Sequence, residues 1–236
     1  MRADHPLAYL LKKHSASFHP VLGYEPAASD LVSLDLSPNN HEFTPDIFSD
    51  TGLFTSVIMR HIAGRNAKFA FGGYDELREM YSKSNVFDAG GEHEEPRRIH
   101  VGLDIWGPAG TPVFAPLGGE LHSSAMNGAD GDYGSTLVLR HSIEGSVFHT
   151  LYGHLSESDL VIEKGTSVAA GQKIGHFGKP DENGNWPPHL HFQIIIDMGA
   201  YEGDYPGVCR FSERDKYLLN CPDPDLIFQI TRYLHV

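Results

Sequence analysis

Cysteine, basic residues and long apolar stretches are scarce in this sequence of 236 residues. Cys209 and Cys221 are too far apart for a Cys-x-x-Cys redox motif or a zinc knuckle, and in a reducing compartment we expect two thiols rather than a disulfide. Lys and Arg total 18 against 31 Asp and Glu, and the resulting formal net charge of −13 excludes a general nucleic-acid-binding surface. The apolar stretch at residues 7–11 is too short for a signal peptide or a membrane span, which predicts a cytoplasmic protein.

Turn-forming residues are plentiful, with 25 Gly and 15 Pro, and the hydrophobic content of 40% is enough for a core. From residue 99 to about 197, short strand-like segments alternate with turns. These segments cover residues 111–116, 120–126, 136–143, 147–155, 173–177 and 189–196. Such spacing predicts a mainly β fold, with an antiparallel sheet packed or folded over itself and a few short helices.

The flanking regions show weaker patterns. Residues 31–36 alternate like a strand and are followed by a turn at 37–40, whereas residues 73–83 have the apolar spacing of a short helix. Residues 222–236 contain helical spacing after Asp223 and Pro224. We therefore divide the chain into an N-terminal extension (1–70), a helix and connector (71–98), a β core (99–197) and a C-terminal extension with a helix (198–236).

The strongest chemical pattern is the pair His189 and His191. In a strand, residues i and i+2 point to the same face about 6.6 Å apart, so both imidazoles are expected to enter one space. His100 and Asp104 add a third nitrogen and a carboxylate, but in a fully extended strand their Cα atoms would lie about 13 Å apart. The chain must therefore bend between them, and Gly102, which lacks a Cβ, allows the bend.

A carboxylate with two imidazoles is a donor set suited to Zn²⁺, and three protein ligands leave the fourth position for water or substrate. Zinc lowers the pKa of water toward about 7, but a further group must accept the proton. The His-Glu-x-x-His motif that supplies such a glutamate in many zinc proteases is absent. His154 and one member of the 189/191 pair are the candidates, because the unperturbed pKa of imidazole is about 6.5.

Five motifs then occur in order over roughly residues 98–197. They are His-x-Gly-x-Asp at 100–104, Gly-Thr-Pro-Val-x-Ala at 110–115, Tyr-Gly-His-Leu-Ser at 152–156, Val-x-x-Gly-Gln-x-Ile-Gly at 168–175 and Pro-His-Leu-His-Phe at 188–192. Together they resemble the lysostaphin-type (LytM-like) zinc endopeptidases.

This resemblance implies zinc ligands His100, Asp104 and His191, with His154 and His189 beside the metal as catalytic histidines. It also implies an antiparallel β fold with a groove, built on a duplicated hybrid motif, and an enzyme that cleaves peptide cross-links of bacterial cell wall. The partner would be a peptide or a peptidoglycan-like substrate. Gln193 stands where the family often has a glutamate, a position that is not a ligand.

Residues 179–188 depart from the family pattern and are expected to form a surface loop at one wall of the groove, where Trp186 can contact substrate. A further resemblance concerns Gly72-Gly-Tyr-Asp-Glu-Leu-Arg78 through Arg98 and the segment Cys221-Pro-Asp-Pro. These look like the flanks of the peptidase-like domain found in bacterial fusion proteins between a kinase-like and an aminotransferase module. Such a setting would be cytoplasmic.

The substrate stays open at this point. One alternative to a cell-wall endopeptidase is a cytoplasmic amide hydrolase acting on a soluble substrate. Another is a zinc-binding scaffold or latent domain whose groove is covered by residues 1–70, with Asn39 or Asn40 in the open metal position. The histidines at 122, 141, 149 and 176 are left out of the site; His149 precedes His154 by an odd number of residues, which in a regular strand puts it on the opposite face.

Overall fold

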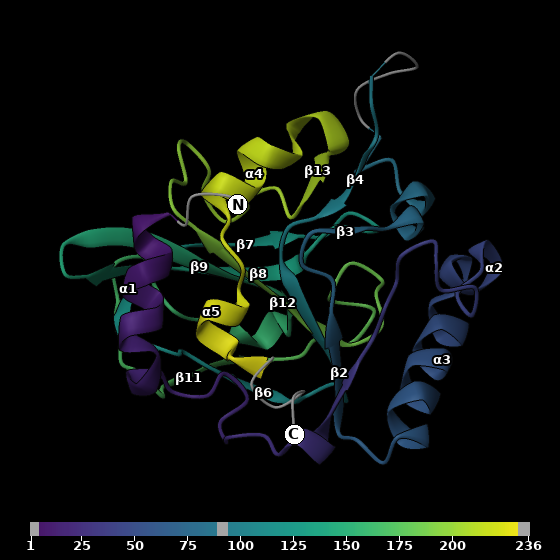
Figure 1. The fold of residues 1–236 in the computed structure, drawn as a ribbon, viewed down its shortest axis with the longest axis horizontal. Coiled ribbons are helices and arrows are strands. Elements are labelled where there is room, and N and C mark those ends of the chain that lie inside the picture. Colours follow the sequence, from purple (N-terminus) through teal and green to yellow (C-terminus); the bar gives the residue numbers. More distant parts are fainter. Residues whose placement is uncertain (1–4, 89–93, 231–236) are drawn as a thin grey trace.

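The computed structural model describes residues 5–88 and 94–230 and shows a mainly β architecture with short helices around it (Figure 1). Most strands form one eight-stranded sheet in the order β1-β2-β5-β12-β9-β8-β7-β10. These strands are β1 (Leu31–Ser33), β2 (Phe69–Gly72), β5 (Leu103–Trp106), β7 (Gly119–Asn127), β8 (Gly134–Ile143), β9 (Ser146–Leu155), β10 (Ser167–Val168) and β12 (His189–Ile195). All pairings in this sheet are antiparallel except that of β1 with β2.

Two smaller sheets complete the β structure. One pairs β6 (Pro112–Phe114) with β11 (Lys173–His176), and the other has the order β13-β4-β3, formed by Val208–Arg210, Arg97–His100 and Glu76–Leu77. The main core lies between the large sheet and the β6/β11 pair, and includes Tyr152, Leu190 and Phe192 from the central strands. The strand segments expected within residues 111–196 are confirmed.

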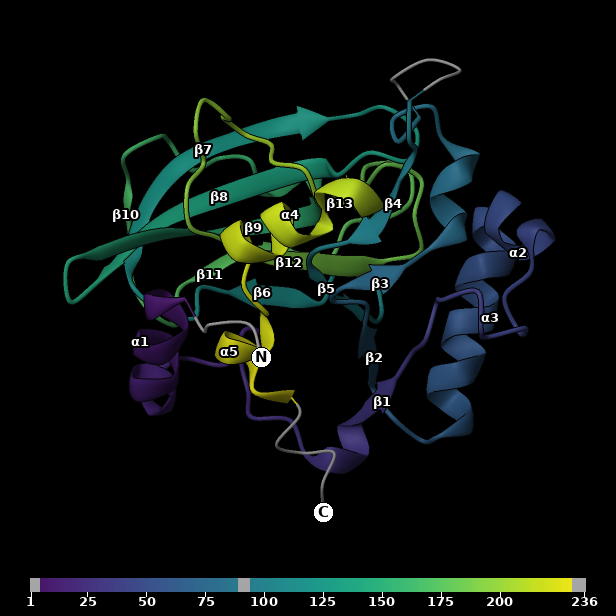
Figure 2. The ribbon, with the colours of Figure 1, turned by 45° about the horizontal axis from the view of Figure 1, so that its top comes forward.

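Residues 31–72 extend the large sheet and pack against it at one edge. β2 pairs with β5, and β1 pairs with β2, so the edge of the sheet lies two strands beyond β5. Helices α2 (Pro45–Ser49) and α3 (Thr51–Gly64) pack beside this edge (Figure 2). Their apolar side chains, including Phe48 and Phe54, belong to the same buried cluster as Trp106 and Trp186.

The helices nearest the two termini pack away from this edge of the sheet. Helix α1 (Pro6–His14) contacts α5 (Asp225–Phe228), and α4 (Arg214–Asn220) lies by β13 (Figure 2). None of the helices in the described parts of the chain is long and apolar enough to cross a membrane.

Two helix predictions are corrected. The helix expected over residues 73–83 is wrong in its first half, because the chain turns at residues 74–75, forms β3 and then only a 3₁₀ helix, Glu79–Lys83. The turn places Asp75 at φ 58°, and β3 pairs with β4, so tertiary pairing overrides the helical spacing. The C-terminal helix is limited to α5 within the described residues, and residues 231–236 of that prediction lie outside them.

Candidate active site

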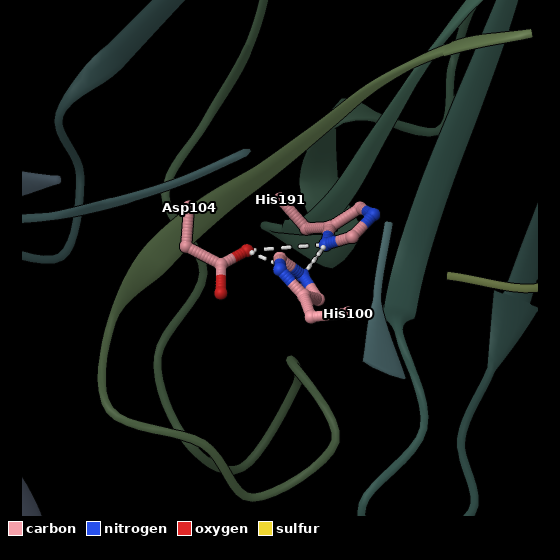
Figure 3. A group of neighbouring side chains, drawn as sticks. All are labelled: His100, Asp104 and His191. Carbon is pink, nitrogen blue, oxygen red and sulfur yellow. Dashed lines mark hydrogen bonds and ion pairs between the residues drawn. The ribbon is translucent and has the colours of Figure 1, made fainter. Parts of the chain in front are cut away.

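His100, Asp104 and His191 meet in the interior, on three different strands (Figure 3). His191 stands opposite Asp104 in the pairing of β12 with β5, and His100 ends β4. Nε2 of His100 lies 2.9 Å from Nδ1 of His191, and Oδ1 of Asp104 lies 3.1 Å from that nitrogen and 3.4 Å from Nε2 of His100. The expected bend between His100 and Asp104 is present, because β4 and β5 belong to different sheets.

These distances suit a metal ion. Ligand atoms at about 2.0 to 2.1 Å from a tetrahedral zinc lie about 3.3 Å from one another, close to the three separations observed. Burial, and next the charge of Arg78, lower the pKa of His100 to about 4, so its imidazole is neutral at neutral pH, as a ligand must be. Burial alone would raise the pKa of Asp104, but His100 and Arg78 hold it well below its usual range, so the carboxylate is ionised.

Neighbouring groups fix which ring nitrogen of each histidine faces the cluster. Nδ1 of His100 donates to the carbonyl oxygen of Gly73 at 2.8 Å, which leaves the Nε2 lone pair free. Nε2 of His191 donates to Oε1 of Gln193 at 3.1 Å, which leaves Nδ1 free. Such hydrogen bonds are the usual means of orienting metal-ligating imidazoles.

Gly102 makes room for one of these rings. A Cβ at this position would lie 2.3 Å from Cε1 of His191 and 2.5 Å from its Nε2. The sequence analysis expected Gly102 to allow a bend of the chain. Its φ angle is not positive, so the backbone conformation itself does not require glycine. The glycine is required here because the imidazole passes directly over its Cα.

His154 and His189 lie side by side next to the cluster. Their ring centroids are 4.1 Å apart, and the centroid of His154 is 6.3 Å from that of His191. Nδ1 of His154 bonds to the carbonyl oxygen of Asn183, and Nδ1 of His189 to that of Pro187, both at 2.7 Å. Nε2 is therefore the nitrogen that each ring offers to a substrate. Burial lowers the pKa of His154 well below its usual range and that of His189 to about 4, so both rings are neutral at neutral pH.

A β-bulge directs His154 toward the site. Tyr152 stands opposite Phe192, and both side chains enter the main core, so a regular strand would send His154 to the core as well. The register of β9 against β8 shifts by one residue between Tyr152 and Leu155, and His154 adopts φ 60°. The side chain consequently faces the cavity. The sequence analysis put His149 and His154 on opposite faces by assuming a regular strand, and the bulge makes that assumption wrong. His149 nevertheless does not line the cavity.

The loop at residues 179–188 is less exposed than the sequence suggested. Asn183 is fully buried and Trp186 is 3% exposed. The amide of Asn183 donates to the carbonyl oxygens of Gly178 and Trp186, and its Oδ1 accepts from the backbone N–H of Trp186. These bonds hold the Asn183 carbonyl that binds His154. The sequence drew attention to Trp186 but gave Asn183 no role.

Comparison with known proteins finds similarity over the β core. Residues 98–202 match the model of peptidase family M23. The match covers somewhat less than half of the chain.

Curated relatives are similar over less than half of the chain. Peptidoglycan DD-endopeptidase ShyA of Vibrio cholerae is 32% identical over 115 residues, which make up 48% of this chain and 24% of that protein. DD-carboxypeptidase/endopeptidase Mpg of Neisseria meningitidis is 33% identical over 100 residues, 42% of this chain and 21% of that protein. The chain thus spans less than a quarter of the length of these two relatives. Among solved structures, a zinc-containing peptidase from Vibrio cholerae is 32% identical and covers 43% of this chain and 28% of that one, with a low TM-score of 0.35.

A cavity of about 230 Å³ opens beside the cluster of His100, Asp104 and His191. Its lining includes the aromatic rings of Tyr81, Phe87 and Trp186 and the carboxyl groups of Asp132 and Asp204. Burial raises the pKa of both carboxyl groups, and no ion pair to either is present among residues 5–88 and 94–230.

Two groups near the cluster of His100, Asp104 and His191 were not recognised in the sequence. Tyr133 places its hydroxyl 3.3 Å from Nε2 of His191 and donates to the carbonyl oxygen of Tyr205. Arg78 donates to Asp104 from outside the matched residues. The only sequence signal for Arg78 was the resemblance of residues 72–78 to the flanks of peptidase-like domains.

The histidines at 122, 141, 149 and 176 lie away from the cavity. His141 is bonded to the carbonyl oxygen of Gly118 and to the hydroxyl of Thr150, and His176 pairs with Asp159. His122 and His149 contact each other, with ring centroids 5.0 Å apart. None of the four lines the cavity.

Proposed function

We propose that this chain is a zinc-dependent metallopeptidase that hydrolyses a peptide amide bond. The observation that supports it best is the convergence of His100, Asp104 and His191, which each offer a ligand atom within 4.8 Å of the other two, beside two neutral imidazoles in one cavity. In this proposal the three residues hold zinc through Nε2, Oδ1 and Nδ1. Zinc, when bound, supplies a Lewis acid that polarises a carbonyl and makes water a nucleophile at neutral pH.

His154 and His189 would move the protons. One neutral imidazole accepts a proton from the attacking water through Nε2, and the resulting imidazolium gives it to the amine that leaves. The Nδ1 bonds to the Asn183 and Pro187 carbonyl oxygens keep Nε2 directed at the reacting amide in the neutral form. In the protonated form the same carbonyl oxygens stabilise the positive charge.

We infer a peptidoglycan-type cross-link as the substrate. The support is that the curated relatives ShyA and Mpg carry endopeptidase names, and that the matched residues include all five proposed site residues. The cavity walls suit a peptide, because aromatic rings pack against its backbone and side chains. Asp132 and Asp204 outnumber the one guanidinium of the lining, that of Arg97, and so favour a positive over a negative group. A cytoplasmic location stays a prediction, to be tested by fractionation.

A direct test compares zinc-loaded protein on isolated peptidoglycan and on soluble peptide amides, each with and without a chelator. Release of new amino groups from peptidoglycan that stops with the chelator is expected. Hydrolysis of soluble amides alone would favour the cytoplasmic amide hydrolase instead. If neither substrate is cleaved by protein with one zinc per chain, the peptidase proposal fails.

The latent-scaffold alternative receives no support from the asparagines considered for it. Asn39 is exposed, and the side chain of Asn40 donates to the carbonyl oxygen of Asp35. The cavity is lined from Met80 onward by described residues, none of them from 5–79. The N-terminal segment contacts the loop at residues 179–188, where the Thr51 hydroxyl donates to the carbonyl oxygen of Asn185.

A further inference from the structure

Arg78 is a fully buried guanidinium that lies outside the residues matched to family M23. Its Nε donates to Oε2 of Glu76 at 2.6 Å, and its Nη1 donates to Oδ2 of Asp104 at 2.5 Å and to the hydroxyl of Tyr81 at 3.2 Å. The guanidinium also lies over the ring of Trp106, 5.5 Å from the ring centroid. A buried charge is costly unless it is paired, so a guanidinium at this position indicates a specific contact with its acidic partners.

The contact divides the two oxygens of Asp104 between different partners. Oδ1 faces the ligand nitrogens of His100 and His191, at 3.4 and 3.1 Å. Oδ2 is engaged by Arg78. The carboxylate therefore offers one oxygen to the cluster.

We propose that Arg78 is a positioning residue that fixes Asp104 as a one-oxygen ligand of the metal. A carboxylate free to rotate can bind through both oxygens and so take the position that water or substrate needs in a hydrolytic zinc site. With Oδ2 bound to Arg78, that position stays open. This inference rests on the proposed function, since it assigns a task in the same metal site.

The same segment orients a second ligand. The Gly73 carbonyl oxygen accepts from Nδ1 of His100, and Gly73 adopts φ 102°. A Cβ on Gly73 would lie 1.8 Å from Nη2 of Arg78 and 2.9 Å from Nδ1 of His100. Residues 73–78 thus hold two of the three ligands from outside the matched domain, and only glycine at 73 lets both contacts exist together.

The test replaces Arg78 in the full chain and follows the metal site directly. Arg78→Met keeps the length and removes the donors, whereas Arg78→Lys keeps one charged donor. Arg140→Met is the matched control, because Arg140 forms an exposed pair with Glu120. Zinc affinity is measured by competition with a chromophoric chelator, coordination by the visible absorption of the Co²⁺-substituted protein, and turnover per bound zinc on the cleaved peptide.

We expect Arg78→Met to weaken the visible Co²⁺ band, because cobalt with more than four ligands absorbs less than tetrahedral cobalt. Turnover per bound zinc should fall about 10- to 100-fold with KM nearly unchanged, the usual effect of removing a partner of a metal ligand. Arg78→Lys should recover part of the band, and Arg140→Met should match the wild type. A purely structural role would lower the yield of folded protein but leave the band and the turnover per zinc intact.

A folded Arg78→Met with the wild-type cobalt spectrum and zinc affinity overturns the inference, and a lysine variant that restores nothing argues against the bond to Oδ2 as the cause. If Arg78→Met does not fold, the double variant with Glu76→Gln, which also neutralises the carboxylate left behind, is judged by the same readouts. The cobalt spectra need no substrate. A wild-type protein that cleaves no peptide would therefore end the proposed function while the role of Arg78 could still be decided.

Discussion

Replacing Gly102 by alanine should weaken metal binding although no proposed ligand is substituted. The new Cβ would lie 2.3 Å from Cε1 of His191, whereas two carbon atoms prefer a separation of about 3.5 Å or more. The imidazole must therefore move by about 1.2 Å, or the chain around residue 102 must move by as much. Metal–ligand distances tolerate only about 0.2 Å, so Nδ1 of His191 leaves its position in the cluster.

The ring cannot restore the geometry by tilting. Its Nε2 is bonded to Gln193 at 3.1 Å and lies 3.3 Å from the Tyr133 hydroxyl, so a tilt breaks one of these contacts. Loss of a supporting hydrogen bond alone costs about 10- to 100-fold in metal affinity. Displacement of the ligand itself should therefore cost at least about 100-fold, or about 2.7 kcal/mol.

Two glycines serve as controls for Gly102→Ala. Gly64 has nothing within 4 Å of an added Cβ, so Gly64→Ala should behave like the wild type. Gly107→Ala places a Cβ 2.6 Å from Cδ1 of Phe69, which crowds an apolar ring instead of a ligand. It should lose about 1 to 3 kcal/mol of stability from overpacking and still bind zinc as the wild type does.

Competition with a chromophoric chelator gives the zinc affinity of all three variants, and urea unfolding of the metal-free proteins gives their stabilities. Wild-type zinc affinity in Gly102→Ala would refute the reasoning, since His191 would then have retained its position or would not be a ligand. Equal losses of affinity in Gly102→Ala and Gly107→Ala would show that general destabilisation, and not displacement of the ligand, is responsible.

The other predictions concern turnover, acid stability and substrate charge. His154→Ala and His189→Ala should each retain zinc but lower kcat about 10²- to 10⁴-fold, because each removes a proton carrier and no ligand; loss of zinc from either variant would contradict the assigned roles. Burial lowers the pKa of His141 to about 4 against about 6.5 in the unfolded chain, so the unfolded chain binds its proton first as the pH falls and stability is lost between these two values. From pH 8 to pH 5 the wild type should lose about 2 kcal/mol more than His141→Gln in urea unfolding, and equal losses would contradict the burial of a neutral ring. A peptide with a lysine beside the scissile amide should have a lower KM than the same peptide with a glutamate, and Asp204→Asn should reduce that difference; equal KM values in the wild type would mean that the two cavity carboxylates do not contact this part of the substrate.

Local rules sufficed for part of the site. The period of two in a strand predicts that His189 and His191 share a face, and both line the cavity. The separation of His100 and Asp104 required a bend, which the change of sheet between β4 and β5 provides. The order of strands across the large sheet was beyond such rules, because it depends on pairings between distant segments.

Other features depend on long-range contacts or on exceptions to periodicity. Arg78 contacts Asp104 across 26 positions of sequence, and the helical spacing around it predicted a different backbone. The bulge at His154 reverses the face that alternation assigns to it. Gly102 was selected correctly as a special position, but only the packed structure shows that the neighbour of its missing Cβ is His191.

The left-handed backbone of His154 has a consequence for comparing homologous sequences. Because one extra residue in β9 makes the side chain face the cavity, adding one residue to β8 opposite the bulge would restore regular pairing and turn the imidazole toward Tyr152 and Phe192. A relative with every one of the five motif histidines and acids in place could therefore be inactive through a one-residue change in strand length. Alignments with M23 peptidases should be scored for the lengths of β8 and β9 as well as for the identities of the residues.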